Sequence, residues 1–316
     1  MRSPCLLRAA GGAYDHPIKE DVMQTTETWQ HRDIITNGIR MHYVTQGSGP
    51  LVILLHGFPE FWYSWRFQIP FLAAHGYTVV APDLRGYNDT DKPRKGYDVA
   101  TLTRDIEGLI KGLGQEKAII AGHDWGGAVA WVFAARYPEM TGRLIIMNAP
   151  HPLAFQREMR TLRQLRKSWY IFFFQLPWLP EYVLLRNNAN EIGRMLRGAA
   201  VQKAVFPREV TAKFQQAMSK PGAMTAALNY YRQVFGRTPW SLAATSNGFQ
   251  VKAPTLIIWG ERDIALGIEL LNGLEQWVDN LQIRRIPSSG HWVQQEQPDQ
   301  VNQLIQEFLQ TPVDHS

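Results

Sequence analysis

The sequence predicts an α/β fold in which a mostly parallel, eight-stranded sheet carries helices on both faces. Three observations support this prediction. Short runs such as Leu51–Leu55 are apolar throughout, as strands buried on both faces require. Helix-like segments alternate with these runs, which is typical of strands joined by crossovers. The alternation stops near residue 150 and resumes near residue 250, which indicates an insertion.

The expected elements follow in chain order from about Thr28. The strands His31–Thr36 and Ile39–Thr45 flank Asn37-Gly38, the strongest short hairpin signal. Six further strands are expected at Leu51–Leu55, Thr78–Ala81, Ala118–Ala121, Leu144–Met147, Thr255–Trp259 and Gln282–Ile286. Helices are expected between them at Trp65–Ala74, Val99–Leu113, Gly127–Arg136 and Gly267–Trp277.

The insertion has a different character, because it lacks strand-like runs apart from the aromatic segment Trp169–Phe174. Its helix-compatible stretches are Leu153–Trp169, Pro180–Asn187, Ala189–Ala204, Pro207–Ser219 and Ala223–Gln233. We therefore expect a core of residues 26–150 and 238–316, a helical cap (lid) of residues 151–237, and an N-terminal extension of residues 1–25. Helical insertions commonly cover the sheet edge at which the strands end and ligands bind.

Composition limits the protein class. Of the 316 residues, 45% are hydrophobic and 19% are charged, which excludes a disordered chain. The single cysteine, Cys5, excludes an internal disulfide and a cysteine-based zinc site, and fits a reducing compartment. Because no apolar run approaches the roughly 20 residues of a membrane helix, and none of secretory length follows the N-terminus, we expect a cytoplasmic protein without a membrane partner.

The positive charge is concentrated in the insertion. Residues 151–237 hold 14 basic and 4 acidic residues, whereas the rest of the chain holds 19 basic and 24 acidic ones, so the overall charge of +5 comes from the cap. No aromatic-interleaved basic stripe accompanies it, so a nucleic-acid partner is not expected. Two interpretations remain: the basic cap is attracted to the acidic body, or it favours anionic substrates.

The motif that carries chemistry follows the strand Ala118–Ala121. It is Gly122-His123-Asp124-Trp125-Gly126-Gly127, the nucleophile-elbow pattern with aspartate where serine is more familiar. The turn from strand to helix is too sharp for side chains at the flanking glycines. It projects Asp124 above the sheet edge, and the Trp125 amide lies at the helix N-terminus, where it can stabilise negative charge.

Two later residues complete a catalytic triad. Asp263 and His291 follow the last two expected strands, and the order nucleophile, acid, histidine is that of α/β-hydrolases. The loop after Leu51–Leu55 supplies a second oxyanion-hole amide, that of Phe58. Asn148 follows the expected strand Leu144–Met147, at the position where some α/β-hydrolases place the acid of the triad. An amide cannot supply the negative charge of that acid.

The chain resembles the α/β-hydrolase superfamily from about residue 28 to its C-terminus and, within it, the soluble epoxide hydrolase family. The matching core segments are His56-Gly57-Phe58-Pro59-Glu60, Asp83-Leu84-Arg85-Gly86-Tyr87 and the elbow. In the cap, Tyr170 with Phe174-Gln175, and Leu228-Asn229-Tyr230-Tyr231-Arg232, resemble the segments that carry the two cap tyrosines of the family. The register assigns the second tyrosine to Tyr231 rather than Tyr230. The resemblance implies the α/β-hydrolase fold with an inserted cap.

The residue types favour one kind of reaction. An aspartate nucleophile attacks a saturated carbon and forms an alkyl ester, which suits strained ethers or alkyl halides. His291, oriented by Asp263, would activate the water that hydrolyses the ester, while the Phe58 and Trp125 amides hold the oxyanion. The resemblance gives Tyr170 and Tyr231 the role of activating an epoxide oxygen. The expected partners are a small-molecule epoxide and water, the product is a vicinal diol, and no cofactor or metal is needed.

Two alternatives remain open. A haloalkane or haloacid dehalogenase would use the Trp125 indole to hold a halide, although Phe58 offers no side-chain donor. A non-catalytic hydrolase-fold binding protein is the other. With Phe58 and Trp125, the residues Trp65, Phe172 and Trp178 are expected to wall an apolar substrate pocket. The sequence does not determine the oligomeric state.

Overall fold

The sheet is the frame of the molecule. The computed structural model describes residues 28–234 and 248–312. Within these ranges eight strands form one sheet in the order β1-β2-β4-β3-β5-β6-β7-β8, in which β2 runs antiparallel to β1 and β4 and the other pairs are parallel. The predicted α/β fold and its eight-stranded sheet are confirmed. The strands are β1 Gln30–Thr36, β2 Ile39–Gln46, β3 Leu51–Leu55, β4 Thr78–Pro82, β5 Ala118–His123, β6 Thr141–Met147, β7 Thr255–Gly260 and β8 Leu281–Ile286.

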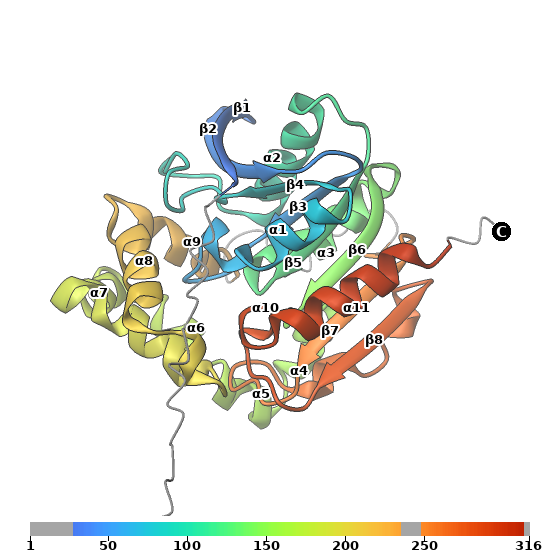
Figure 1. Ribbon diagram of the computed structural model, residues 1–316. Coiled ribbons are helices and arrows are strands. Elements are labelled where there is room, and N and C mark those ends of the chain that lie inside the picture. Colours follow the sequence, from blue (N-terminus) through green and yellow to red (C-terminus); the bar gives the residue numbers. More distant parts are fainter. Residues whose placement is uncertain (1–27, 235–247, 313–316) are drawn as a thin grey trace, which may run out of the picture.

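Helices cover both faces of the sheet (Figure 1). One face packs against α2 (Val99–Gly112) and α3 (Trp125–Arg136), and the other against α1 (Gln68–Ala74), α10 (Val293–Glu296) and α11 (Pro298–Gln310). Short 3-10 turns, η1 (Trp62–Trp65) and η2 (Pro138–Met140), lie in the connections. Two more, η5 (Ile268–Leu271) and η6 (Leu274–Gln276), replace the predicted helix Gly267–Trp277, because Gly273 takes a left-handed conformation (φ 70°) between them.

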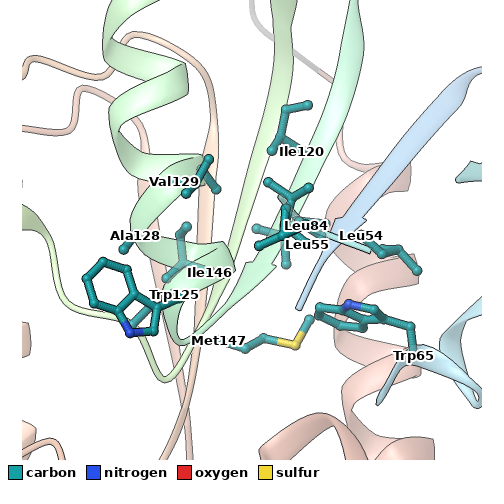
Figure 2. Packing of buried hydrophobic residues seen from close by; sticks show 14 of the residues in the cluster. Leu54, Leu55, Trp65, Leu84, Ile120, Trp125, Ala128, Val129, Ile146 and Met147 are labelled. Carbon is teal, nitrogen blue, oxygen red and sulfur yellow. The ribbon is translucent and has the colours of Figure 1, made fainter. Parts of the chain in front are cut away.

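The helix α3 lies at the centre of the core. It is apolar on all sides, and its first eleven residues, Trp125 to Ala135, are all buried, as a helix enclosed by sheet and neighbouring helices requires. Figure 2 shows Val129 of α3 turned toward the strands that carry Ile120 and Ile146. This packing holds the N-terminus of α3 at the end of β5, where the elbow lies.

The cap consists of the helices between β6 and β7. They are α4 Pro152–Glu158, α5 Leu162–Lys167, α6 Trp169–Phe173, α7 Leu179–Ala199, α8 Arg208–Ser219 and α9 Ala223–Val234, with the 3-10 turn η3 at Lys203–Val205. The predicted continuous helix Leu153–Trp169 is divided, because the Thr161 side chain caps a new helix by accepting the Gln164 amide. The stretches predicted to either side of residue 188 are two helices that share the label α7, because residues 186–189 between them have non-helical backbone.

The cap is attached to the loops that follow β7 and β8. From α5, the Gln164 side chain donates to the Ala265 carbonyl (2.9 Å) and accepts from the Gly267 amide (3.1 Å). The Lys167 ammonium donates to the Asp263 carbonyl at 2.7 Å. Beyond the C-terminal end of α7, the Glu296 carboxylate accepts hydrogen bonds from the backbone amides of residues 201, 202 and 290.

Some predictions fall outside the described residues. These are the N-terminal extension of residues 1–25 with Cys5, and the boundary between cap and core at residues 237 and 238. None of the described helices is both long and apolar enough to cross a membrane.

Candidate active site

Asp124 stands on the elbow between β5 and α3. Its backbone has φ 49° and ψ −120°, a conformation that is strained for any residue with a Cβ. The glycines make the turn possible: a Cβ on Gly122 would lie 2.4 Å from the Gly126 carbonyl oxygen, and one on Gly126 would lie 2.1 Å from the Leu55 oxygen. The sequence thus places Asp124 above the sheet edge, as predicted.

The loop after β3 approaches the Asp124 carboxylate. The Phe58 amide donates a hydrogen bond to Asp124 Oδ1 at 2.8 Å. Gly57 permits this approach, because a Cβ there would lie 2.4 Å from the Asp124 Cβ. Trp125 is the first residue of α3, so its amide belongs to the positive end of the helix. One oxygen of Asp124 is therefore held by an amide, and the other is available for chemistry.

His291 and Asp263 form a buried pair that faces Asp124. His291 Nδ1 lies 2.7 Å from Asp263 Oδ2, and His291 Nε2 lies 3.6 Å from Asp124 Oδ2. The Asp263 carboxylate also accepts the amides of Ala265 (2.7 Å) and Leu266 (2.9 Å). These bonds fix the Asp263 carboxylate, which in turn orients the imidazole.

Asn148 also positions the Asp263 carboxylate. Its Nδ2 donates to Asp263 Oδ2 at 2.8 Å, and its Oδ1 accepts the Gly260 amide at 2.8 Å. From the sequence, Asn148 is only a residue that cannot replace the acid, and no role is predicted for it. Its place at the end of β6, next to the strand that precedes Asp263, was the available signal.

The surroundings of the His291–Asp263 pair shift the pKa of both side chains. Burial alone would lower the pKa of His291, but the charges of Asp263 and Asp124 and the hydrogen bonds to both carboxylates outweigh it, so that pKa is well above 6.5. Burial alone would raise the pKa of Asp263, but the charge of His291 and the hydrogen bonds from His291, Leu266 and Asn148 lower it. Asp263 thus stays ionised and stabilises the imidazolium form of His291.

A second buried pair, Glu60 with His123, connects the loops that carry Gly57, Asp124 and His291. His123 precedes the nucleophile, and its Nδ1 lies 2.8 Å from Glu60 Oε2 while its Nε2 lies 2.8 Å from the His291 carbonyl oxygen. Both of these partner atoms are hydrogen-bond acceptors. Glu60 also accepts the Gly57 amide at 3.0 Å. Glu60 belongs to the segment His56-Gly57-Phe58-Pro59-Glu60, but the sequence alone predicts no function for it.

A cavity of about 300 Å³ connects the nucleophile with the cap. Asp124, His291, Tyr170 and Tyr231 all line it, and so does Phe58. The Tyr170 and Tyr231 ring centroids are 5.9 Å apart. Burial and the nearby Asp124 charge raise the pKa of both phenols, so each keeps its proton at neutral pH.

The neighbouring Tyr230 has a separate task. Its hydroxyl donates to the Arg85 carbonyl at 2.8 Å, and its ring is fully buried. Tyr231 is the member of the pair that faces the cavity, in the register that the cap motif predicted.

Three residues expected to wall the pocket lie outside the cavity lining. Trp65 is fully buried, because the turn η1 packs it against the sheet. Phe172 and Trp178 lie on the outer side of the cap, 47% and 72% exposed. The lining instead includes Phe174, Met195 and Trp292, together with Lys167 and Trp169.

Among the described residues, one group of side chains is close enough to hold a metal ion, namely His42, Asp83 and Asp89. His42 Nδ1 already lies 2.7 Å from Asp83 Oδ2, and Asp89 pairs with Lys220 at 2.6 Å. None of these residues lines the cavity. The group therefore has internal partners and no connection to the nucleophile.

Comparisons with known proteins agree with this geometry. A family model described as "alpha/beta hydrolase fold" matches residues 50–298. Epoxide hydrolase 3 of Xenopus tropicalis is 41% identical over 284 residues, which are 86% of this chain and 75% of that protein. Epoxide hydrolase 4 of Homo sapiens is 39% identical over 283 residues, which are 86% and 76% of the two chains. An epoxide hydrolase of Bacillus megaterium, solved in complex with an inhibitor, is 32% identical and has a TM-score of 0.80, covering 89% of this chain and 100% of that one. The chain therefore belongs to the α/β-hydrolase superfamily and, within it, to the epoxide hydrolases.

Proposed function

We propose that this enzyme adds water to an epoxide to give a vicinal diol through a covalent ester on Asp124. One observation carries the proposal: an aspartate on a nucleophile elbow, a buried His–Asp pair and two phenols line the same cavity. The names of the relatives support the substrate class.

In the first step, Asp124 Oδ2 attacks an epoxide carbon while Oδ1 stays on the Phe58 amide. The carbon–oxygen bond of the epoxide breaks, and the oxygen takes a proton from Tyr170 or Tyr231. Because both phenols are fully protonated at neutral pH, they are suited to donate this proton. The product of this step is an alkyl ester on Asp124 and one tyrosinate.

In the second step, His291 Nε2 takes a proton from water, and the oxygen of that water attacks the ester carbon Cγ. The charge develops on Oδ1, where the Phe58 and Trp125 amides stabilise it. The Cγ–Oδ2 bond then breaks, and His291 returns its proton to the departing diol oxygen. The second proton of the water restores the tyrosine, so the net reaction consumes one water molecule.

The charge of Asp124 links the two steps. In the free enzyme this charge is one of the causes that raise the pKa of His291. Ester formation removes the charge, so the pKa of His291 falls. The imidazolium then releases its proton to solvent, and the neutral imidazole is available as the base.

Dehalogenation is less well supported. The side chain of Trp125 already forms a hydrogen bond with Tyr231, and Phe58 provides no side-chain donor for a halide. The non-catalytic alternative fits poorly, because the nucleophile, the base and the acid are all present and within reach of one another.

A single-turnover reaction in ¹⁸O-labelled water tests the nucleophile. With enzyme in excess over styrene oxide, we expect the label in the peptide that contains Asp124, because the first diol takes its oxygen from the carboxylate. Label found directly in the first-turnover diol would contradict the covalent mechanism.

Matched tyrosine variants test epoxide activation. Tyr231→Phe and Tyr170→Phe should each lower the rate of ester formation, and the double variant should abolish it. Tyr230→Phe is the control, because it also removes a tyrosine hydroxyl, but one that donates a hydrogen bond to the Arg85 carbonyl. Equal rates for Tyr231→Phe and Tyr230→Phe would refute the assigned role.

A further inference from the structure

Exposed apolar side chains are concentrated on one part of the cap. Ten large hydrophobic side chains are exposed among the described residues, and eight of them lie in the segment 162–185 or beside it at Ile264. We name these eight the cap ridge: Leu162, Trp169, Phe172, Leu176, Trp178, Tyr182, Leu185 and Ile264. The other two, Ile35 and Phe67, lie in the core domain.

Helical spacing brings the ridge residues onto common faces. Trp169 and Phe172 are three residues apart on α6, and Tyr182 and Leu185 are three residues apart on α7. Trp178 precedes α7 as its N-cap residue (φ 51°), and its carbonyl accepts a hydrogen bond from the Tyr182 amide at 3.0 Å. The opposite sides of these helices are buried. The ridge is therefore a second apolar side of helices whose inner side already faces the core.

Arg232 holds the two halves of the ridge together. Its guanidinium donates to the carbonyls of Phe174 (3.1 Å) and Leu176 (3.0 Å) in the connection between α6 and α7. It also pairs with Glu181, in the first turn of α7, at 2.8 Å. The exposed aromatic side chains are thus presented from a fixed backbone.

The charge around the ridge is positive. Residues 160–186 contain five basic residues and one acidic residue. Arg163 pairs with Glu269 and Arg186 with Glu191, and the acid, Glu181, pairs with Arg232. Within the described part of the chain, the excess positive charge of this segment therefore comes from Arg160, Arg166 and Lys167. Arg160 and Arg166 are exposed, and within the described part of the chain neither forms an ion pair. Tryptophan and tyrosine beside arginine and lysine are the composition of surfaces that bind at the interface of anionic membranes.

The ridge adjoins the entrance of the active-site cavity. Trp169 and Ile264 belong to both, and Lys167 lies in the cavity wall at the end of α5. A surface that docked through the ridge would bring this entrance to the region where apolar molecules dissolve in a bilayer.

We propose that the cap ridge docks this enzyme on anionic phospholipid membranes. A second copy of the chain fits the surface less well, because a symmetric contact would oppose two patches of the same positive charge. This mode needs no spanning helix, so it differs from the insertion that the sequence argument excluded when it expected no membrane partner. Docking is independent of the proposed function, whereas uptake of lipophilic epoxides from the bilayer rests on it.

Vesicle co-sedimentation of the full chain tests the docking. We expect binding to vesicles of phosphatidylcholine with about 30 mol% phosphatidylserine, and weaker binding to phosphatidylcholine alone or in about 0.5 M salt. Trp178→Ser with Tyr182→Ser, neither of which lines the cavity, should weaken binding by about tenfold or more. The matched control is Ile35→Ser with Phe67→Ser, which removes exposed apolar side chains elsewhere and should bind as the wild type does.

Two double variants of basic residues separate the electrostatic from the apolar contribution to vesicle binding. Arg160→Gln with Arg166→Gln should weaken binding to the anionic vesicles, whereas Lys252→Gln with Arg284→Gln, exposed residues of the core, should not. Equal binding by the ridge variant and its control would overturn the proposal. So would a lack of binding to both vesicle types, or a dimer in sedimentation equilibrium that the ridge variant dissociates while vesicles remain unbound.

The result of the vesicle-binding test is independent of catalysis, because binding can also be measured with the Asp124→Asn variant. Hydrolysis of a water-soluble epoxide by the ridge variant should equal that of the wild type, while hydrolysis of a lipophilic epoxide delivered in anionic vesicles should fall. If vesicle binding persists but no epoxide is hydrolysed, the proposed function fails and the docking stands.

Discussion

Replacing Glu60 with glutamine should destabilise the enzyme by about 3 kcal/mol at neutral pH. Burial alone would raise the pKa of Glu60, but the charge of His123 and the hydrogen bonds from His123, Gly57 and Ser64 lower it to about 2, from an ordinary 4.5. A decrease of this size corresponds to about 3 kcal/mol of stabilisation of the folded state. Glu60→Gln keeps the shape of the side chain and removes the charge.

The surroundings limit how well an amide can be accommodated. Glu60 Oε1 accepts hydrogen bonds from Gln294 (3.2 Å) and Gln295 (2.8 Å). Gln294 can turn its amide over, since its own oxygen has no hydrogen-bond partner, but the Gln295 oxygen already accepts from Arg66 at 2.6 Å. The glutamine variant therefore leaves an N–H group opposite another N–H group.

The pH dependence has a definite sign. Because the folded-state pKa is lowered, the stabilisation is fully present above about pH 4.5 and is lost as the pH falls toward about 2. We expect the difference in unfolding free energy between wild type and Glu60→Gln, measured by urea denaturation with tryptophan fluorescence, to be constant from pH 7 to 5 and to shrink below that. Glu116→Gln, at an exposed site, is the control and should change stability by less than about 0.5 kcal/mol. Equal stability of the two variants at pH 7, or a difference that grows on acidification, would refute the reasoning.

Three further predictions concern the site. Asn148→Ala should lower the unfolding free energy by about 2 kcal/mol and reduce kcat, because it removes hydrogen bonds that position the catalytic acid; an unchanged pH–rate profile and stability would contradict this. Asp124→Asn should lower the pKa of His291, since a charge that raises it is lost, and an NMR titration midpoint that stays or rises would show that the charge has no such effect. Gly126→Ala should lower the unfolding free energy, measured by thermal denaturation, by more than about 3 kcal/mol, because its Cβ would lie 2.1 Å from a carbonyl oxygen. Gly198→Ala, at a helical site with open space, is the control and should raise the unfolding free energy by up to about 1 kcal/mol.

The sheet and the elbow were predictable because their determinants are local. A strand buried on both faces must be apolar throughout, so Leu51–Leu55 could be recognised without knowledge of its partners. The glycines around Asp124 record the steric demand of the turn itself. Asp263 and His291 could be placed because parallel strands end at one edge of the sheet.

The orientation of side chains in the cap was not predictable in the same way. Trp65, Phe172 and Trp178 are equally apolar in sequence, yet one lies in the core and two lie on the surface, because the rotation of each short helix decides which side faces inward. The Glu60–His123 pair joins residues 63 positions apart, so no local pattern indicates it. Tyr231 was distinguished from Tyr230 only through the resemblance to a family.

The hydrogen bonds that Gln164 and Lys167 make to residues 263–267 have a consequence for protein engineering. A cap with other residues at positions 164 and 167 would lose the hydrogen bonds to the backbone of Asp263, Ala265 and Gly267. A functional chimera should therefore transfer the cap and the loop at residues 263–267 together.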